Sequence, residues 1–219
     1  MERVPEPELM LEEEQARAYA EADFSAPHQM FVDYFREIFG PHLEGVVLDL
    51  GCGPADIAVR FAKAFPACQI HGVDGSPAMI KYGKERIEKE GLEARIKLFL
   101  GKIPEFELPE HFYDAVIVNS LLHHLPQPEI LWETIKKTAR GGAAVLVMDL
   151  LRPKSPQEAR SLVEKYASSE PEILKRDFYH SLLAAYTPPE VRDQLEKTGL
   201  FHFEIRVISD RHWIVFGRL

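Results

Sequence analysis

The sequence predicts an α/β protein built on a doubly wound, mainly parallel seven-stranded sheet. Three observations lead to this prediction: apolar runs alternate with amphipathic helical stretches in the middle of the chain, the pattern then becomes wholly helical, and two short apolar runs end the sequence. The chain has 219 residues, which is the size of one generous domain rather than two.

Five apolar, β-branched runs bounded by glycine or acidic residues are typical of buried strands. They are residues 46–50, 69–73, 96–100, 113–118 and 143–148. Between them, apolar residues recur at helical spacing in residues 57–65, 77–89 and 128–138. Because strand and helix alternate, we expect the five strands to be parallel.

Helical segments flank this core on both sides. Residues 9–39 predict two amphipathic helices that separate at Ser25-Ala26-Pro27. After the fifth strand we expect helices at about 156–167, 171–185 and 188–197, followed by a strand pair at 203–208 and 212–217 with an antiparallel final strand. The single domain then divides into a helical lid (1–40), a core (41–150), a helical insertion that covers the substrate (151–199) and a strand pair that completes the sheet (200–219).

Composition excludes several classes of protein. Hydrophobic residues make up 46% and charged residues 28%, as in folded globular proteins. The formal charge of −9 disfavours a nucleic-acid partner. Cys52 and Cys68 form neither a disulfide framework nor zinc-type spacing, so we expect a reducing compartment and no metal. Without a leader-like start or a membrane-length apolar run, the sequence predicts a cytoplasmic protein, and a homodimer is compatible with it.

The most informative stretch is a predicted strand that runs into a glycine turn and then a helix. Gly51 and Gly53 lack the β-carbon that would keep a nucleotide away from the backbone. Dinucleotide-binding loops have a small residue at the position of Asp56, because an acid there would repel phosphate. S-adenosylmethionine has no phosphate but carries a sulfonium and an ammonium, which Asp49 and Asp56 match in charge. The turn therefore favours this cofactor over NAD.

A second acid, Asp74, ends the next predicted strand. A carboxylate at this position can accept both ribose hydroxyls of a nucleoside. The alternative is that Asp74, or Ser76 behind it, only caps the helix that begins at Pro77. The position of Asp74 after a glycine loop favours ribose binding.

Three stretches together, DLGCGPAD, GVDGSPAMI and YDAVIVNSLLHHL, resemble class I S-adenosylmethionine-dependent methyltransferases over residues 45–150. The resemblance implies a Rossmann-like core. The cofactor-binding residues that it implies are Asp49, Gly51, Cys52, Gly53, Asp74, Gly75, Ser76, Met79, Lys102, Ile103 and Asn119. Two positions depart from the family: Ala55 replaces a third glycine, and Lys102 stands where members often place an acid that accepts the adenine amino group, which a lysine cannot do.

The segment after the fourth strand carries the candidate catalytic residues Asn119, His123 and His124. Ligand crevices of doubly wound sheets open at the carboxyl ends of the strands. A histidine of near-neutral pKa there could remove a proton from an oxygen, nitrogen or sulfur nucleophile. Alternatively, the two histidines cap the turn before Pro126, and methyl transfer proceeds by proximity and desolvation alone.

Substrate specificity is expected in the segments outside the core. The candidate substrate residues are Tyr19, Phe24, His28, Arg152, Arg176 and Tyr179. Tyr19 and Phe24 are placed to close over the cofactor, and either arginine could bind a substrate carboxylate.

The function predicted from these features is transfer of a methyl group from S-adenosylmethionine to a small molecule by in-line displacement. Two alternatives use the same cofactor: an enzyme with a non-methylating reaction, and a non-catalytic sensor or accessory protein, which the missing adenine acid would suit. An NAD-dependent oxidoreductase is the third.

Overall fold

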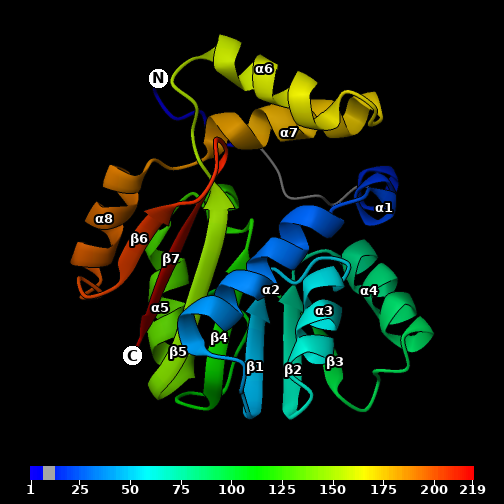
Figure 1. Cartoon of the computed structure of the whole chain (residues 1–219), viewed down its shortest axis with the longest axis vertical. Helices are drawn as coiled ribbons and strands as arrows, with labels where there is room; N and C mark the ends of the chain where they lie inside the picture. The colour runs from blue at the N-terminus through cyan, green and yellow to red at the C-terminus, as the bar shows by residue number, and fades with distance from the viewer. Residues whose placement is uncertain (7–12) are drawn as a thin grey trace.

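The computed structural model describes residues 1–6 and 13–219. Its centre is a seven-stranded sheet in the order β3-β2-β1-β4-β5-β7-β6, which confirms the predicted fold class. The strands are β1 Gly45–Leu50, β2 Cys68–Asp74, β3 Ile96–Leu100, β4 Tyr113–Asn119, β5 Ala139–Leu150, β6 Glu204–Val207 and β7 His212–Arg218. β1 to β5 pair in parallel, whereas β7 pairs antiparallel with both β5 and β6 (Figure 1).

Helices cover both faces of the sheet. They are α1 Glu13–Glu21, α2 Ser25–Phe39, α3 Asp56–Ala64, α4 Pro77–Lys89, the short 3-10 turn η1 Leu122–His124, α5 Glu129–Thr138, α6 Pro156–Ala167, α7 Glu172–Ala184 and α8 Pro188–Lys197. Alternate strand residues point to opposite faces. Val47 and Ile117 pack with α2 and α3, whereas Leu48 and Val116 pack in the second core with α5 and α8.

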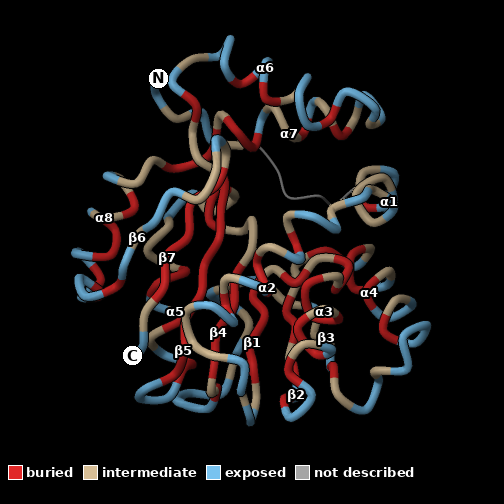
Figure 2. Tube along the Cα trace, viewed as in Figure 1, coloured by how far each residue is buried: buried red, intermediate tan, exposed pale blue. Residues whose placement is uncertain are grey.

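A third layer lies above the carboxyl ends of the strands. Figure 1 shows α6 and α7 there, and these helices have a small apolar cluster of their own. α1 is attached on two sides, because Gln15 donates a 2.8 Å hydrogen bond to Asp177 of α7, and Arg86 of α4 donates one of 3.1 Å to the Ala20 carbonyl. In Figure 2 the buried strand ends lie below α6 and α7, and α1 lies to one side of them, above α4.

Three details differ from the sequence prediction. The break between α1 and α2 precedes Ser25, whose amide donates to Asp23, and Pro27 lies in the first turn of α2, where proline is tolerated. α8 packs against the core, where Trp132 donates to Gln194, so only α6 and α7 of the expected insertion cover the strand ends. β5 starts at Ala139, before the expected strand. Within the described residues, no helix is both long and apolar enough to cross a membrane.

Candidate active site

The glycine loop leaves β1 and is held by backbone bonds to β2. The amides of Gly51 and Cys52 both donate to the Val73 carbonyl, at 2.8 and 3.1 Å. Gly51 and Gly53 have positive φ angles of 72° and 50°, a conformation that favours glycine. A β-carbon built on Gly53 would meet no described atom within 4 Å. The loop thus presents open backbone at the carboxyl edge of the sheet, where a ligand can approach closely.

Asp49 lies beside this loop with its charge uncompensated. The residue is 2% exposed, and its Oδ2 atom accepts no hydrogen bond from the residues that the structure describes. Burial, with a contribution from the charge of Asp74, raises the Asp49 pKa to about 7. A buried carboxylate without a partner is costly, and a cation bound nearby would offset that cost.

Asp74 joins the two loops that follow β1 and β2. Its Oδ2 accepts the Gly53 amide at 2.9 Å, and its Oδ1 accepts the Ser76 amide at 2.8 Å. Ser76, rather than Asp74, caps α4 by accepting the Met79 amide. Burial raises the Asp74 pKa despite these bonds. Each carboxylate oxygen retains acceptor capacity for a ligand hydroxyl.

The neighbouring edge at the end of β3 offers an apolar surface. Leu100 pairs with Asp74 in register and is 52% exposed, which is unusual for a leucine at a strand end. The stem of Lys102 covers Gly75, since a β-carbon there would lie 2.8 Å from the lysine Cγ. Ile103 packs partly into the core, and Met79 is buried. Leu100 is a candidate contact for a flat apolar ring that the sequence analysis missed.

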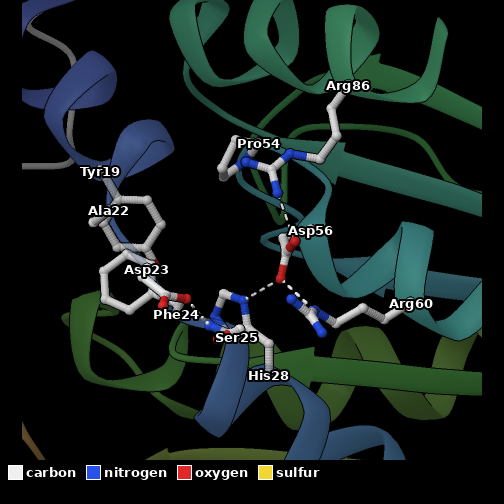
Figure 3. Close-up of a pocket in the computed structure, with 10 residues that line it drawn as sticks. All are labelled: Tyr19, Ala22, Asp23, Phe24, Ser25, His28, Pro54, Asp56, Arg60 and Arg86. Atoms are coloured by element: carbon white, nitrogen blue, oxygen red, sulfur yellow. Dashed lines mark hydrogen bonds and ion pairs between the residues drawn. The ribbon is translucent and has the colours of Figure 1, made fainter. Parts of the chain in front are cut away.

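Asp56 does not play the part expected from the sequence. Its carboxylate is bound by His28 at 2.7 Å, Arg60 at 2.7 Å and Arg86 at 2.5 Å (Figure 3). Although burial raises its pKa, His28 and Arg60 outweigh burial and hold the pKa of Asp56 well below its usual range. The carboxylate is neutralised by protein groups, so the expectation that it matches a ligand cation was wrong. Arg60 is one helical turn away, a pairing that the sequence already displayed.

Three predicted substrate residues gather around that ion cluster. Tyr19 stacks on Phe24 with 4.6 Å between ring centroids, and Phe24 packs on His28 at 5.4 Å. With neighbouring residues they line a cavity of about 130 Å³ that reaches Pro54 of the glycine loop (Figure 3). Burial and the charges of Asp74, Asp56 and Asp149 raise the Tyr19 pKa to about 12. The Tyr19 hydroxyl is thus close enough to these three carboxylates to be affected by their charge. His28 is committed to Asp56.

The turn after β4 is organised by Asp149, at the end of β5. Asp149 Oδ2 accepts the Leu122 amide at 2.7 Å, and its Oδ1 lies 2.6 Å from His123 Nδ1. Both side chains are almost fully buried. Burial lowers the His123 pKa, but the Asp149 charge outweighs it and the net shift is upward. The upward shift favours an imidazolium bound to the carboxylate, and the charged form of His123 cannot accept a proton.

His124 has the opposite character. Burial, together with the positive charge of His123, lowers its pKa, so His124 is neutral at pH 7. Its Nδ1 lies 2.6 Å from Oε2 of Glu6, which belongs to the N-terminal segment. The two adjacent histidines therefore have opposed pKa shifts. The shift of His123 favours its charged form, and the shift of His124 favours the neutral form that can accept a proton. Of the two, His124 is the better candidate base.

Glu6, His123 and His124 are also the one group in the described part of the chain whose ligand atoms lie close enough to hold a metal ion, within 4.8 Å of one another. The imidazole rings are tilted relative to each other, with centroids 4.1 Å apart and planes 37° from parallel. Asp149 occupies one nitrogen of His123, which leaves only the other nitrogen for an ion. The absence of a metal remains a prediction.

Asn119 ends β4 at the centre of the crevice. Its Oδ1 atom is buried and has no hydrogen-bond partner in the described chain. Ser120 follows with a φ of 54°, a conformation that is rare for a residue with a side chain, and its amide donates to Met148 of β5. This sharp turn brings Leu121 against Gly51, so the catalytic and cofactor loops are packed together. Strained backbone of this kind is common at ligand sites.

The three remaining substrate candidates lie away from this crevice. The Arg152 side chain is 7% exposed, and its Nη atoms donate to Glu190 at 2.7 Å and to the Ala185 carbonyl at 3.3 Å, whereas its buried Nε has no partner in the described chain. Arg176 is mostly exposed and contacts Asp177. Tyr179 packs in the apolar cluster of α6 and α7. The α7 face toward α1 and the N-terminal segment presents Asp177 and Ser181 instead.

The sequence analysis missed two residues of the N-terminal segment. Arg3 donates to the carbonyls of Ala184 and His123 at 2.6 and 2.8 Å and lies over the Tyr186 ring. Glu6 accepts a 2.6 Å hydrogen bond from Ser181. No local sequence pattern predicts contacts between positions so far apart in the chain. Asp149 could have been found, because it ends the strand beside β4.

Comparison with known proteins agrees with this geometry. The family model described as a methyltransferase domain matches residues 47–142. The demethylmenaquinone methyltransferase of Porphyromonas gingivalis is 29% identical over 120 residues, which cover 54% of this chain and 48% of the relative. An uncharacterised methyltransferase of Bacillus subtilis is 31% identical over 123 residues, covering 56% of this chain and 62% of the relative. The chain thus spans about half the length of the first of these curated relatives.

Solved structures share the fold over most of the chain. A SAM-dependent methyltransferase from Aquifex aeolicus superposes with a TM-score of 0.68 at 17% identity, covering 92% of this chain and 96% of that one. Phosphoethanolamine N-methyltransferase 2 of Haemonchus contortus, in complex with S-adenosyl-L-methionine, gives 0.64 at 21% identity, covering 83% and 39%. At these identities the likeness concerns the fold.

Proposed function

Because residues 47–142 form a class I S-adenosylmethionine-dependent methyltransferase domain, we propose that this protein transfers a methyl group from S-adenosylmethionine to a small molecule held beneath α6 and α7. The observation that carries the proposal is the orphaned carboxylate of Asp49 beside the open backbone of Gly53. A buried anion next to a bare loop suits a ligand that brings positive charge and no phosphate.

The residues around the loop fit the cofactor part by part. Asp49 would face the sulfonium or the ammonium, and Asp74 would accept the ribose hydroxyls while it holds Gly53. Leu100, together with the stem of Lys102, would pack on adenine, with no acid required. Main-chain atoms of the 102–103 segment are the proposed polar contacts of the base. The arrangement offers no comparable site for a diphosphate, because Asp49 and Asp74 would repel it.

When bound, S-adenosylmethionine supplies a methyl group on a positively charged sulfur. The protein contributes position, exclusion of water and a proton acceptor. Asn119 and the turn after it would align the nucleophile, and Tyr19 with Phe24 would limit the entry of water. Neutral His124 would take the proton that the nucleophile loses, while the His123–Asp149 pair holds the turn rigid. General-base assistance of this kind contributes roughly 10²- to 10⁴-fold.

The acceptor is proposed to be a small molecule because α6 and α7 lie above the carboxyl ends of the strands. Demethylmenaquinone methyltransferases among the relatives make a quinone or quinol an acceptor worth testing. Only about half of the first relative's length is matched, so a quinone acceptor is a candidate to be tested.

The proposal is tested by incubating the full chain with methyl-labelled S-adenosylmethionine and a metabolite extract, followed by mass identification of the labelled product. Parallel calorimetric titrations compare S-adenosylmethionine with NAD. Binding of the first cofactor together with a methylated product is expected. Binding without any demethylated cofactor would favour a sensor or accessory role, a carboxylated or otherwise altered cofactor would favour the non-methylating reaction, and tight NAD binding would reject the proposal.

A further inference from the structure

We propose that Glu6 of the N-terminal segment belongs to the methyl-acceptor site, and that this site takes an uncharged or cationic small molecule that presents an amine, thiol or hydroxyl group to Glu6 and His124. The inference rests on the proposed methyl transfer and deepens it by assigning the chemical class of the acceptor. Neither Glu6 nor this class follows from the cofactor-binding motifs.

Glu6 is held in place from two directions. The Ser181 hydroxyl of α7 donates to Glu6 Oε1 at 2.6 Å, and the Glu6 side chain is only 8% exposed. Upstream, Arg3 ties the segment to the His123 carbonyl on the catalytic turn and to Ala184 at the end of α7. The Val4 amide adds a 3.0 Å hydrogen bond to Leu183. A carboxylate buried this deeply and anchored on both sides is part of a built site.

The other oxygen of Glu6 is not satisfied. Glu6 Oε2 and His124 Nδ1 are 2.6 Å apart, yet neither atom has a hydrogen bond of good geometry within the described chain. Neutral His124 must carry its proton on Nδ1, since a bare nitrogen would set its lone pair against that of the carboxylate. Nε2 then has the free lone pair. Glu6 Oε2 therefore faces the Nδ1–H group of His124 at poor hydrogen-bond geometry, and it keeps acceptor capacity for a ligand N–H, O–H or S–H group.

Charge defines the acceptor further. Burial raises the pKa of Glu6, but contact with His124 and the hydrogen bond from Ser181 outweigh burial, and the net shift is downward, so the group is ionised. Asp149, on the far side of the two histidines, is ionised and balanced by His123. Arg3, on this side of the crevice, is already committed to two carbonyls. An anionic acceptor would therefore meet the Glu6 carboxylate, while the nearby cations His123 and Arg3 are already engaged with Asp149 and with two carbonyls.

The reaction balances with these groups. The heteroatom of the acceptor attacks the methyl carbon as the carbon–sulfur bond breaks, and the bonding pair stays on sulfur, which becomes a neutral thioether. The heteroatom passes one proton to Nε2 of His124, from which it goes to water. In a cationic amine this transfer precedes the attack, because only the neutral amine has a lone pair on nitrogen. Glu6 neither gains nor loses a proton, so it is an acceptor-binding residue rather than the base.

Binding of matched one-ring probes tests the inference without knowledge of the natural acceptor. The full chain is saturated with S-adenosylhomocysteine, and the affinities of benzylamine, phenol, phenylmethanethiol and benzoate are measured by ligand-observed NMR. We expect the first three to bind and benzoate to bind at least about tenfold more weakly, because a buried like charge costs this much or more. Equal or tighter benzoate binding would overturn the inference, as would failure of all three donor probes.

Variants assign the effect to Glu6. Glu6→Gln should weaken benzylamine binding by about tenfold or more, since a charged hydrogen bond is lost. Glu2→Gln is the matched control, because it removes the same charge from an exposed position in the same segment and should change nothing. Ser181→Ala keeps the charge but releases the carboxylate, so a smaller loss is expected. Unchanged benzylamine binding in both Glu6→Gln and Ser181→Ala would contradict the inference.

S-adenosylhomocysteine affinity distinguishes a failure of the proposed function from a failure of the proposed acceptor class. It should stay the same in Glu6→Gln, because Glu6 lies on the acceptor side, toward α7. If the wild-type chain binds no S-adenosylhomocysteine, the proposed function itself fails. If it binds normally while the probe results contradict the expectation, only the acceptor class is wrong.

Discussion

Replacement of Asp49 by asparagine tests the electrostatic basis of cofactor binding. Asp49 is buried, its Oδ2 atom has no partner in the described chain, and its pKa is raised to about 7. If only the ionised carboxylate pairs with the cofactor cation, the affinity follows the ionised fraction. That fraction falls from about 0.76 at pH 7.5 to about 0.09 at pH 6, which predicts an affinity loss of roughly eightfold.

The direction of this effect follows from protonation. As the pH falls, Asp49 takes up a proton and becomes neutral, so binding of a cation weakens. Asp49→Asn should bind S-adenosylmethionine more weakly at pH 7.5, by roughly 1 to 3 kcal/mol for a lost charged hydrogen bond. Between about pH 6 and pH 7.5, the variant should also lose most of the pH dependence of the wild-type chain.

Isothermal titration calorimetry at several pH values measures both quantities. Asp33→Asn is the matched control, because it removes an exposed charge on α2 and should leave both the affinity and its pH dependence intact. An Asp49→Asn variant that retained the wild-type pH profile would refute the reasoning, since another group would then govern binding.

Three more expectations concern stability and turnover. Without cofactor and near pH 8, the free energy of unfolding of Asp49→Asn should exceed that of wild type by up to about 4 kcal/mol, which thermal unfolding measures as a higher midpoint temperature. The reason is that wild-type stability falls as the pH rises from about 4 through 7, where native Asp49 gives up its proton. His124→Asn should lower kcat by about 10²-fold or more with unchanged cofactor affinity. Asp149→Asn should destabilise the fold by roughly 3 to 5 kcal/mol, seen in urea unfolding, because buried His123 loses its counter-ion; equal stability would contradict the ion pair.

The fold and the cofactor loop were predictable because their signals are local. A strand, a turn and a helix follow one another from β1 through Gly51 and Gly53 to α3, and Asp74 ends the strand paired with β1. The apolar runs of the five strands indicate burial on both faces of the sheet, so the sheet could be predicted without knowledge of long-range contacts. The sequence also placed α6 and α7 after β5, where they cover the strand ends.

The charge balance of the site was less predictable. Asp56 was interpreted from its own charge, although Arg60 one turn away and Arg86 on the next helix neutralise it. Glu6 meets Ser181 across 175 positions of sequence, and no periodicity or motif encodes that contact. Pairings of this kind depend on how the lid and the insertion pack, which follows from the tertiary structure alone.

The acids of the crevice differ in what balances them, and this difference links cofactor binding to proton release. Asp149 is paired with His123, and Asp74 accepts two main-chain amides. Asp49 alone among these three has a side-chain oxygen with no partner in the described chain. At pH 7 a group of pKa about 7 is half protonated, so a bound cation should expel about half a proton per site. Calorimetry in buffers of different ionisation enthalpy measures this release, which should nearly vanish near pH 8.5 and in Asp49→Asn; release that persists in the variant would mean that the cofactor cation is balanced elsewhere.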